Sequence, residues 1–188
     1  DIGDIIWIDC SRLNLGQVKN DVNSMWDLNV HDLAIVDYLT NGAEVQSVKA
    51  MGTKVYSHRE SITQLMVQYD GFFATMRASW VSPIKERKII IAGTQKMIVY
   101  DDVDVLNKLI VYDKGFDTAE GTEYADYVIK ARSGDAIIPK LSVEDALFNS
   151  LEHFRQCIVK GEQSITGADA AIRVINILEK ADKSLNDK

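Results

Sequence analysis

Two residues in the segment MWDLNVHDLAIVDYL, residues 25–39, have the types and spacing of an acid–base pair. Asp27 and His31 are four residues apart, so both are expected to project from the same face of an α-helix. A carboxylate one turn from an imidazole can fix its tautomer and favour its protonated form. The pair could therefore act as a general acid–base, a role that typically contributes ~10²–10⁴-fold to a rate.

The same two residues also have purely structural interpretations. Asp27 lies at the expected helix start, where a carboxylate accepts hydrogen bonds from free backbone N–H groups. His31 could be a core histidine whose hydrogen bonds are satisfied. No metal site is expected, because zinc needs a third protein ligand and neither His58 nor His153 has a matching spacing.

A second candidate site lies in the segment WVSPIKER, residues 80–87. Pro83 indicates a loop between two strands, which would place Lys85 and Arg87 at a sheet edge. There the two cations could bind a phosphate or a carboxylate. Protection of an edge strand by charge is the alternative explanation.

A third candidate is the loop LNLGQVKNDVNSMW, residues 13–26, which leads directly into Asp27. Its amide side chains suit the hydroxyl groups of a sugar, and Asn14 and Asn23 are the candidates for such contacts. An ordinary solvated loop would have a similar composition.

Composition excludes several classes of protein. The net charge of -7 argues against a nucleic-acid surface. The two cysteines, Cys10 and Cys157, stand in no metal or redox motif, which predicts reduced thiols and a cytoplasmic protein. No apolar run approaches the ~20 residues of a membrane span, and no signal peptide is visible. The chain also lacks GxGxxG, Walker, GxSxG and HExxH motifs.

Hydrophobic periodicity predicts the elements that position these residues. Helices are expected over residues 27–39, from Ser142 to residue 160, and from Thr166 onward. The buried stripe of the last helix is expected at Ala171, Val174, Ile175 and Leu178. Strands are expected at residues 5–13, 45–55, 87–93, 96–102, 108–114 and 127–131, with a type I′ hairpin over residues 62–80 that turns at Asp70–Gly71.

This order of elements predicts one α+β domain over residues 1–188. We expect an open, mostly antiparallel mixed β-sheet with helices packed on one face, a two-layer sandwich. The other face must then be solvated or covered by a partner, and self-association through it is expected.

Four ordered segments resemble the C-terminal domain of the glucose–fructose oxidoreductase and inositol dehydrogenase family (Gfo/Idh/MocA). GDIIWIDCSRLNLG (3–16) is similar to the strand that opens that domain, and WDLNVHDLAIVDYL (26–39) to its D-x-x-x-H-D helix. SWVSPIKERKIIIAGTQKMIVYDD (79–102) resembles the S-W-x-x-P-x-K-x-R strand pair of a subgroup. TGADAAIRVINILEKADKSL (166–185) is similar to the family's final helix.

The resemblance implies roles for individual residues. His31 would be the acid–base, and Asp27 would lie beside the nicotinamide and the substrate. Asn29 stands where many family members have glycine, and its side chain is expected to contact substrate or cofactor. The family also has an N-terminal Rossmann domain with a glycine-rich loop and a catalytic lysine, so about 120 residues would be absent before Asp1.

The expected function is that of the substrate-binding and oligomerisation domain of a dehydrogenase. The substrate would be a sugar or nucleotide sugar, contacted by Asn14, Asn23, Lys85 and Arg87, and the cofactor NAD or NADP, bound mainly by the absent domain. A homodimer or homotetramer would form through the open sheet face. The alternative is a non-enzymatic ligand-binding or dimerisation module without a cofactor domain.

Overall fold

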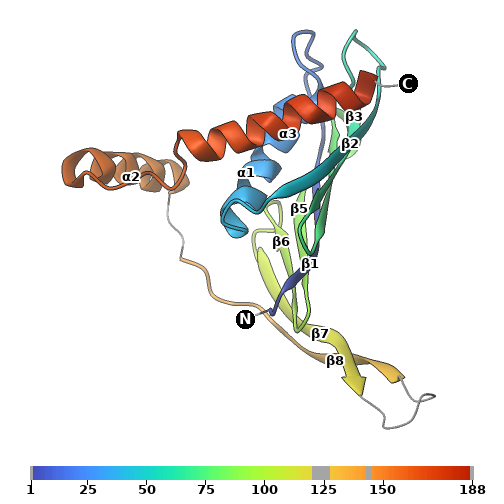
Figure 1. The fold of residues 1–188 in the computed structure, drawn as a ribbon, viewed down its shortest axis with the longest axis vertical. Coiled ribbons are helices and arrows are strands. Elements are labelled where there is room, and N and C mark those ends of the chain that lie inside the picture. Colours follow the sequence, from blue (N-terminus) through green and yellow to red (C-terminus); the bar gives the residue numbers. More distant parts are fainter. Residues whose placement is uncertain (1, 120–127, 143–144, 187–188) are drawn as a thin grey trace.

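The computed structural model describes residues 2–119, 128–142 and 145–186. It contains an eight-stranded sheet in the order β2-β3-β4-β1-β5-β6-β7-β8, with helices on one face (Figure 1). The strands are β1 Ile5–Leu15, β2 Val45–Thr53, β3 Ile62–Tyr69, β4 Phe73–Ser79, β5 Val81–Gly93, β6 Met97–Asp101, β7 Leu109–Ala119 and β8 Val128–Ile137. The helices are η1 Met25–Asn29, α1 Val30–Leu39, α2 Ala146–Lys160 and α3 Ala168–Asn186.

The sheet is mixed because β1, the first strand of the chain, lies in the middle of the sheet, between β4 and β5. β1 pairs in parallel with β4 and antiparallel with β5, and every other neighbouring pair is antiparallel. The strand-rich middle of the chain and the helical C-terminal part thus form the expected α+β arrangement. The prediction of an open, mostly antiparallel sheet with helices on one face is confirmed.

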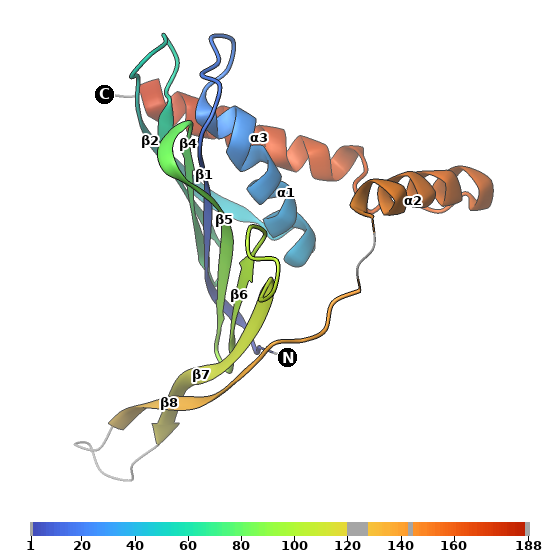
Figure 2. The same cartoon turned by 180° about the vertical axis from the view of Figure 1, so that it is seen from behind.

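The side chains of β1 point to the two faces of the sheet in turn, and this alternation places the core residues. Ile8 and Cys10 are fully buried and face the helices, where β4 and β3 add Met76 and Leu65 in register. Helices α1 and α3 lie side by side on one face of the sheet, and α3 also packs directly against β2 (Figure 2). α1 contributes Leu33 and Val36 to this core, and α3 contributes Val174, Ile177, Leu178 and Ala181.

Several predicted boundaries were wrong in detail. Helix α2 begins at Ala146 rather than at Ser142, because the side chain of Asp145 accepts the N-cap hydrogen bond from Phe148 N. The buried stripe of α3 keeps Val174 and Leu178, but Ala171 and Ile175 are exposed and Ile177 and Ala181 take their places. The Val143 and Glu144 positions lie outside the described residues.

The predicted hairpin over residues 62–80 is present, and β5 and β6 form a second one. β3 and β4 turn at Asp70–Gly71, but only Gly71 has a positive φ (82°), so the turn is not type I′, which needs positive φ at both central residues. β5 and β6 pair across Thr94. The predicted loop at Pro83 was wrong, because β5 runs unbroken through it. β6 pairs only from Lys88 onward, so that side of β5 needs no donor at Pro83.

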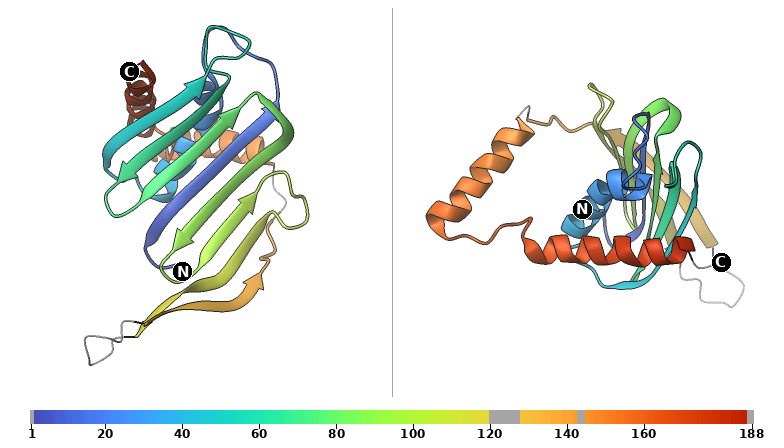
Figure 3. Two further views of the ribbon diagram at one scale, coloured as in Figure 1. Left: turned by 90° about the vertical axis from the view of Figure 1, so that its right-hand side faces the viewer. Right: turned by 90° about the horizontal axis from the view of Figure 1, so that it is seen from above.

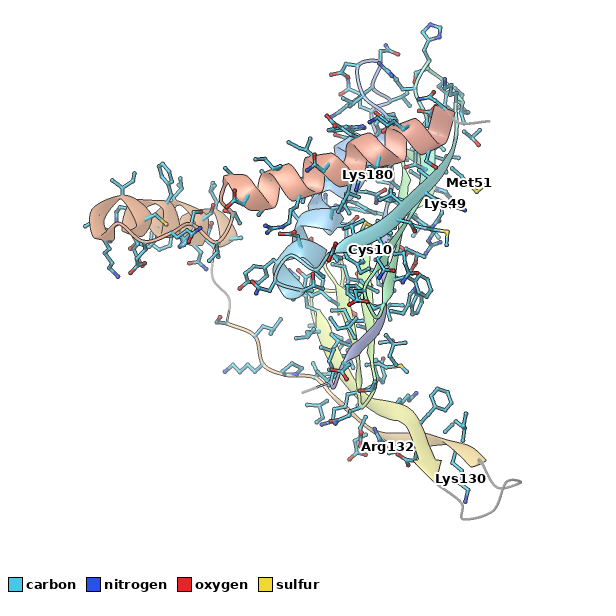
Figure 4. The ribbon with its side chains drawn as sticks, viewed as in Figure 1. Cys10, Lys49, Met51, Lys130, Arg132 and Lys180 are labelled. Carbon is cyan, nitrogen blue, oxygen red and sulfur yellow. The ribbon has the colours of Figure 1, made fainter. Side chains whose placement is uncertain are left out.

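The face of the sheet opposite the helices is uncovered among the described residues (Figure 3). Cross-strand register places Lys49, Met66, Thr75 and Asp9 on this face. Figure 4 shows Lys49 and Met51 projecting away from α3. Met51, Ile62, Met66 and Phe73 are exposed apolar side chains here, mixed with polar ones.

Candidate functional site

The motif helix begins with a π-helical turn. η1 covers Met25–Asn29 and continues directly into α1, so the helix starts two residues earlier than expected. Asp27 lies in the π-helical part and His31 in the first turn of α1. π-helical turns are rare and are frequent at functional sites.

Both carboxylate oxygens of Asp27 have partners outside the helix. Oδ2 accepts from Nε1 of Trp80 at 2.9 Å, and Oδ1 forms an ion pair with Nζ of Lys19. Trp80 is buried, whereas Lys19 is exposed on the loop before η1. The hydrogen bond to Asp27 raises the pKa of Lys19 above its ordinary value, because the carboxylate favours the ammonium form.

His31 is exposed on the surface of α1. Within the described part of the chain, its side chain makes no hydrogen bond or ion pair, and Asp27 is therefore not its partner in this arrangement. The four-residue spacing predicted a shared face because it assumed an α-helix. In a π-helix the hydrogen bonds run from i to i+5, so four residues fall short of one turn.

Beneath His31 lies a buried ion pair that was not predicted. The guanidinium of Arg12 on β1 donates to Oδ1 of Asp32 from Nε at 3.1 Å and from NH2 at 2.7 Å. Asp32 is only 1% exposed, and its Oδ2 accepts from Nδ2 of Asn29 at 3.2 Å. Asn29 is itself fully buried and has no exposed surface toward a ligand. Together these groups attach the motif helix to β1.

The two loop asparagines occupy different environments. Asn23 is buried, donates to Asp182 at 3.0 Å and to Glu60 at 3.4 Å, and accepts from Trp26 N at 3.1 Å. Its amide thus joins the loop to α3 and is used within the protein. Asn14 lies near the end of β1 and is half-buried, and its Oδ1 has no partner among the described residues.

Lys85 and Arg87 lie on β5 before the point at which β6 begins to pair with it at Lys88, so among the described strands this part of β5 has a partner only in β1. Arg87 is in register with Arg12, so it projects from the helix-bearing face. Its NH1 is 3.6 Å from Oδ2 of Asp102. Lys85 is exposed two residues away on the same face and forms no ion pair with any described residue.

Three residues around the motif helix were missed as parts of the site: Lys19, Trp80 and Arg12. Trp80 stands in the S-W motif, but nothing local links it to Asp27, which is 53 residues away. Arg12 carried a usable signal, since a charged residue in the inward-facing series of Ile8 and Cys10 needs a buried partner.

The described residues contain no group of His, Cys, Asp or Glu side chains that could hold a metal ion. None of the described helices has the length and apolarity to span a membrane. The glycines include no GxG spacing, so this chain has no loop to cradle a dinucleotide pyrophosphate.

Comparisons with known proteins agree with this geometry. The sequence profile of the GFO/IDH/MocA C-terminal domain matches residues 2–99. UDP-N-acetylglucosamine 3-dehydrogenase GnnA from Acidithiobacillus ferrooxidans shares the fold, with 22% identity, a TM-score of 0.74, and coverage of 97% of this chain and 55% of its own. Aldose-aldose oxidoreductase from Caulobacter crescentus has 14% identity, a TM-score of 0.74, and coverage of 98% and 54%.

GenD2 from gentamicin A biosynthesis, solved in complex with NAD, has 14% identity, a TM-score of 0.72, and coverage of 99% and 54%. A comparison with curated protein sequences gives no match. The chain spans about 55% of the length of the solved structures that it resembles. The profile match and the shared fold identify the chain as a member of the GFO/IDH/MocA C-terminal domain family.

Proposed function

We propose that this chain is the substrate-binding, acid–base domain of an NAD(P)-dependent dehydrogenase that acts on a hydroxyl group of a sugar or nucleotide sugar. Residues 1–188 act as one such domain, and the cofactor is held mainly by a separate dinucleotide-binding domain. Membership of the family supports this assignment, as do the oxidoreductases among the structural neighbours.

The observation that carries the proposal is the exposed, unpaired imidazole of His31 on a rigidly attached helix. The helix is fixed to β1 by the Arg12–Asp32 ion pair and to the junction of β4 and β5 by the Trp80–Asp27 hydrogen bond. A general base needs a free nitrogen, and the ring nitrogens of His31 have no partner among the described residues, on a helix whose backbone is attached to the sheet.

When bound, the nicotinamide ring supplies the acceptor for a hydride from the carbinol carbon. His31 then takes the proton of the substrate hydroxyl, because loss of hydride makes that proton acidic. Asp27 lies four residues earlier on the same helix, with its oxygens bound to Lys19 and Trp80, so we assign it a supporting role as a carboxylate of fixed position near the reacting groups.

Charged side chains on the same face suit an anionic substrate. Lys85 is exposed and without an ion-pair partner among the described residues, and Arg87 lies beside it. Both project from the sheet face that carries α1. Such cations bind phosphate or carboxylate, and a nucleotide sugar carries a diphosphate. Asn14, with its unpaired amide oxygen, is the candidate for a sugar hydroxyl.

The open face of the sheet supports self-association as a homodimer or homotetramer. It carries four exposed apolar side chains, Met51, Ile62, Met66 and Phe73, among polar neighbours. A sheet face of this kind suits an isologous two-fold contact, because each copy offers the same surface.

The proposal is tested by assaying the full-length gene product with NAD or NADP against a panel of free sugars and UDP-sugars. We expect reduction of the cofactor with at least one UDP-sugar and a lower kcat/KM with the matching free sugar. A gene product without a cofactor domain, or one that reduces neither cofactor with any sugar, would favour the non-enzymatic module instead.

A further inference from the structure

Helix α2 is amphipathic, yet none of its residues is buried. Four large apolar side chains, Leu147, Leu151, Phe154 and Ile158, follow one side of the helix and are between 59% and 69% exposed. We call these four residues the α2 stripe. Seen from above, α2 lies apart from the sheet and from α1 (Figure 3). A 15-residue helix in water is marginal without tertiary packing, so the stripe needs a partner surface.

The spacing of the stripe indicates what kind of surface it fits. Its residues follow one another at intervals of four, three and four, which is the spacing of a seam that packs against another helix. On the neighbouring side of α2, Arg155 donates to Glu152 at 2.7 and 2.8 Å, and Gln156 donates to Glu152 at 2.9 Å. Phe148 and Val159 are also exposed there, but the α2 stripe is the continuous apolar row along the helix.

A second apolar surface lies at the other end of the connection from α2. A groove of about 290 Å³ between α1 and α3 is lined by apolar residues of both helices and by Ile165 and Thr166. Ile165 N donates to Nε2 of His153 on α2 at 3.3 Å, which joins the connection to that helix. The groove and α2 both lie on the helix-bearing side of the sheet, away from its open face (Figure 3).

The comparisons bear on which molecule covers the stripe. The solved structures match 96–99% of this chain, so the match includes α2, but they match over only 54–56% of their own length. Those proteins therefore contain nearly as much further structure beside an α2-like segment. Folds that bind dinucleotides carry helices on both faces of their sheet, which is the surface that the stripe spacing requires.

We propose that the α2 stripe docks on a surface helix of the dinucleotide-binding domain that supplies the cofactor. This inference rests on the proposed function, because it assumes that such a domain works with this chain. Docking of α2 and the adjoining groove would fix the cofactor domain on the helix-bearing side of the sheet, where His31 is exposed. The α2 stripe is then an interface between cofactor domain and substrate domain.

Hydrogen exchange of α2 peptides tests the docking directly. We would compare the 188-residue chain with the full-length gene product that includes the cofactor domain. Exchange over α2 should be fast in the chain alone and at least about 100-fold slower in the full-length product. Leu151→Glu with Phe154→Glu should restore fast exchange over α2 in the full-length product. Asn149→Glu introduces a charge on the same helix on the side away from the stripe and should leave the protection intact.

Three outcomes would overturn the docking, and they can be told apart. Fast exchange over α2 in a product that still binds NAD(P)H removes the docking but leaves the proposed function. Protection of α2 in the chain alone, lost together with dimerisation in the double variant, would assign the stripe to a second copy. A gene product with no cofactor domain removes both the docking and the proposed function. Slow exchange over Val174 and Leu178 of α3 in every sample verifies that each variant is folded.

Discussion

Nε1 of Trp80 donates to Oδ2 of Asp27 at 2.9 Å, which ties the junction of β4 and β5 to the motif helix. A hydrogen bond from a buried donor to a carboxylate contributes about 1.5–3 kcal/mol. We expect Trp80→Phe and Asp27→Ala to be coupled by about 1–2 kcal/mol in a double-mutant cycle measured by urea unfolding.

Trp7 provides the matched control for this cycle. Its Nε1 is buried but has no partner among the described residues. Trp7→Phe therefore makes the same change of ring as Trp80→Phe but removes no hydrogen bond. Trp7→Phe and Asp27→Ala should be additive within about 0.5 kcal/mol. Equal coupling in both cycles would show that the Trp80 hydrogen bond does not hold Asp27.

For the ion pair between Arg12 and Asp32, we expect removal of one partner to destabilise the fold more than replacement of both partners. Asp32→Ala leaves the Arg12 guanidinium buried without its partner and should destabilise the fold by about 3–5 kcal/mol. Joint replacement by Arg12→Met and Asp32→Leu should cost less than Asp32→Ala alone, because no uncompensated charge remains. The exposed pair of Lys160 and Glu162 is the control, and Lys160→Ala should cost about 0–1 kcal/mol. Similar losses for Asp32→Ala and Lys160→Ala would contradict the assigned role.

Cys10 should be chemically inert in the native chain. Burial raises the pKa of its thiol well above the ordinary value, and the negative charges of Asp32 and Asp9 raise it further. Iodoacetamide at pH 8 should therefore label Cys157, which is half-buried, and spare Cys10, as judged by mass spectrometry of tryptic peptides. Equal labelling of the two cysteines would contradict the burial of Cys10.

The raised pKa of Cys10 also determines how the free energy of unfolding changes with pH. The folded chain keeps the Cys10 proton at pH values where the unfolded thiol, with a pKa of about 8.5, has released it. The stabilisation that the buried, protonated thiol gives to the fold is fully present below pH ~8.5 and is lost as the pH rises above that value. Cys10→Ala should flatten the loss of unfolding free energy between pH 8 and 10. An unchanged slope would contradict a raised thiol pKa.

Self-association through the open sheet face makes a further prediction. Met66→Glu and Phe73→Glu place charges at the centre of that face and should convert oligomers to monomers in sedimentation velocity. Leu106→Glu changes an equally apolar, exposed residue outside that face and should leave the oligomer intact. A monomeric parent chain at high concentration would exclude this contact.

Local patterns in the sequence predicted the elements that depend on neighbouring residues. The turn at Asp70–Gly71 and the inward alternation of Ile8 and Cys10 could be read from short stretches. Glycine at position 161 ends α2 in the left-handed conformation, as its place after Lys160 indicates. The fold class followed from the order of these elements.

Relationships over long distances along the chain could not be predicted. The parallel pairing of β1 with β4 brings together residues 66 positions apart, such as Cys10 and Met76. Asn23 donates a hydrogen bond to Asp182, which is 159 residues away. The sequence gives no sign of this partner, so the position of Asn23 in a polar loop suggested a ligand contact. The Asp27–His31 pairing failed for a local reason, because the sequence carries no clear signal for a π-helical turn.

The central claim is that His31 is the acid–base residue, and His31→Ala in the full-length gene product tests it most directly. We expect kcat to fall about 10²–10⁴-fold with KM changed little, because the imidazole acts mainly in the transition state. His58→Ala is the control, since His58 is exposed on the β2–β3 connection and away from the motif helix. A kcat for His31→Ala equal to that of His58→Ala would contradict the account.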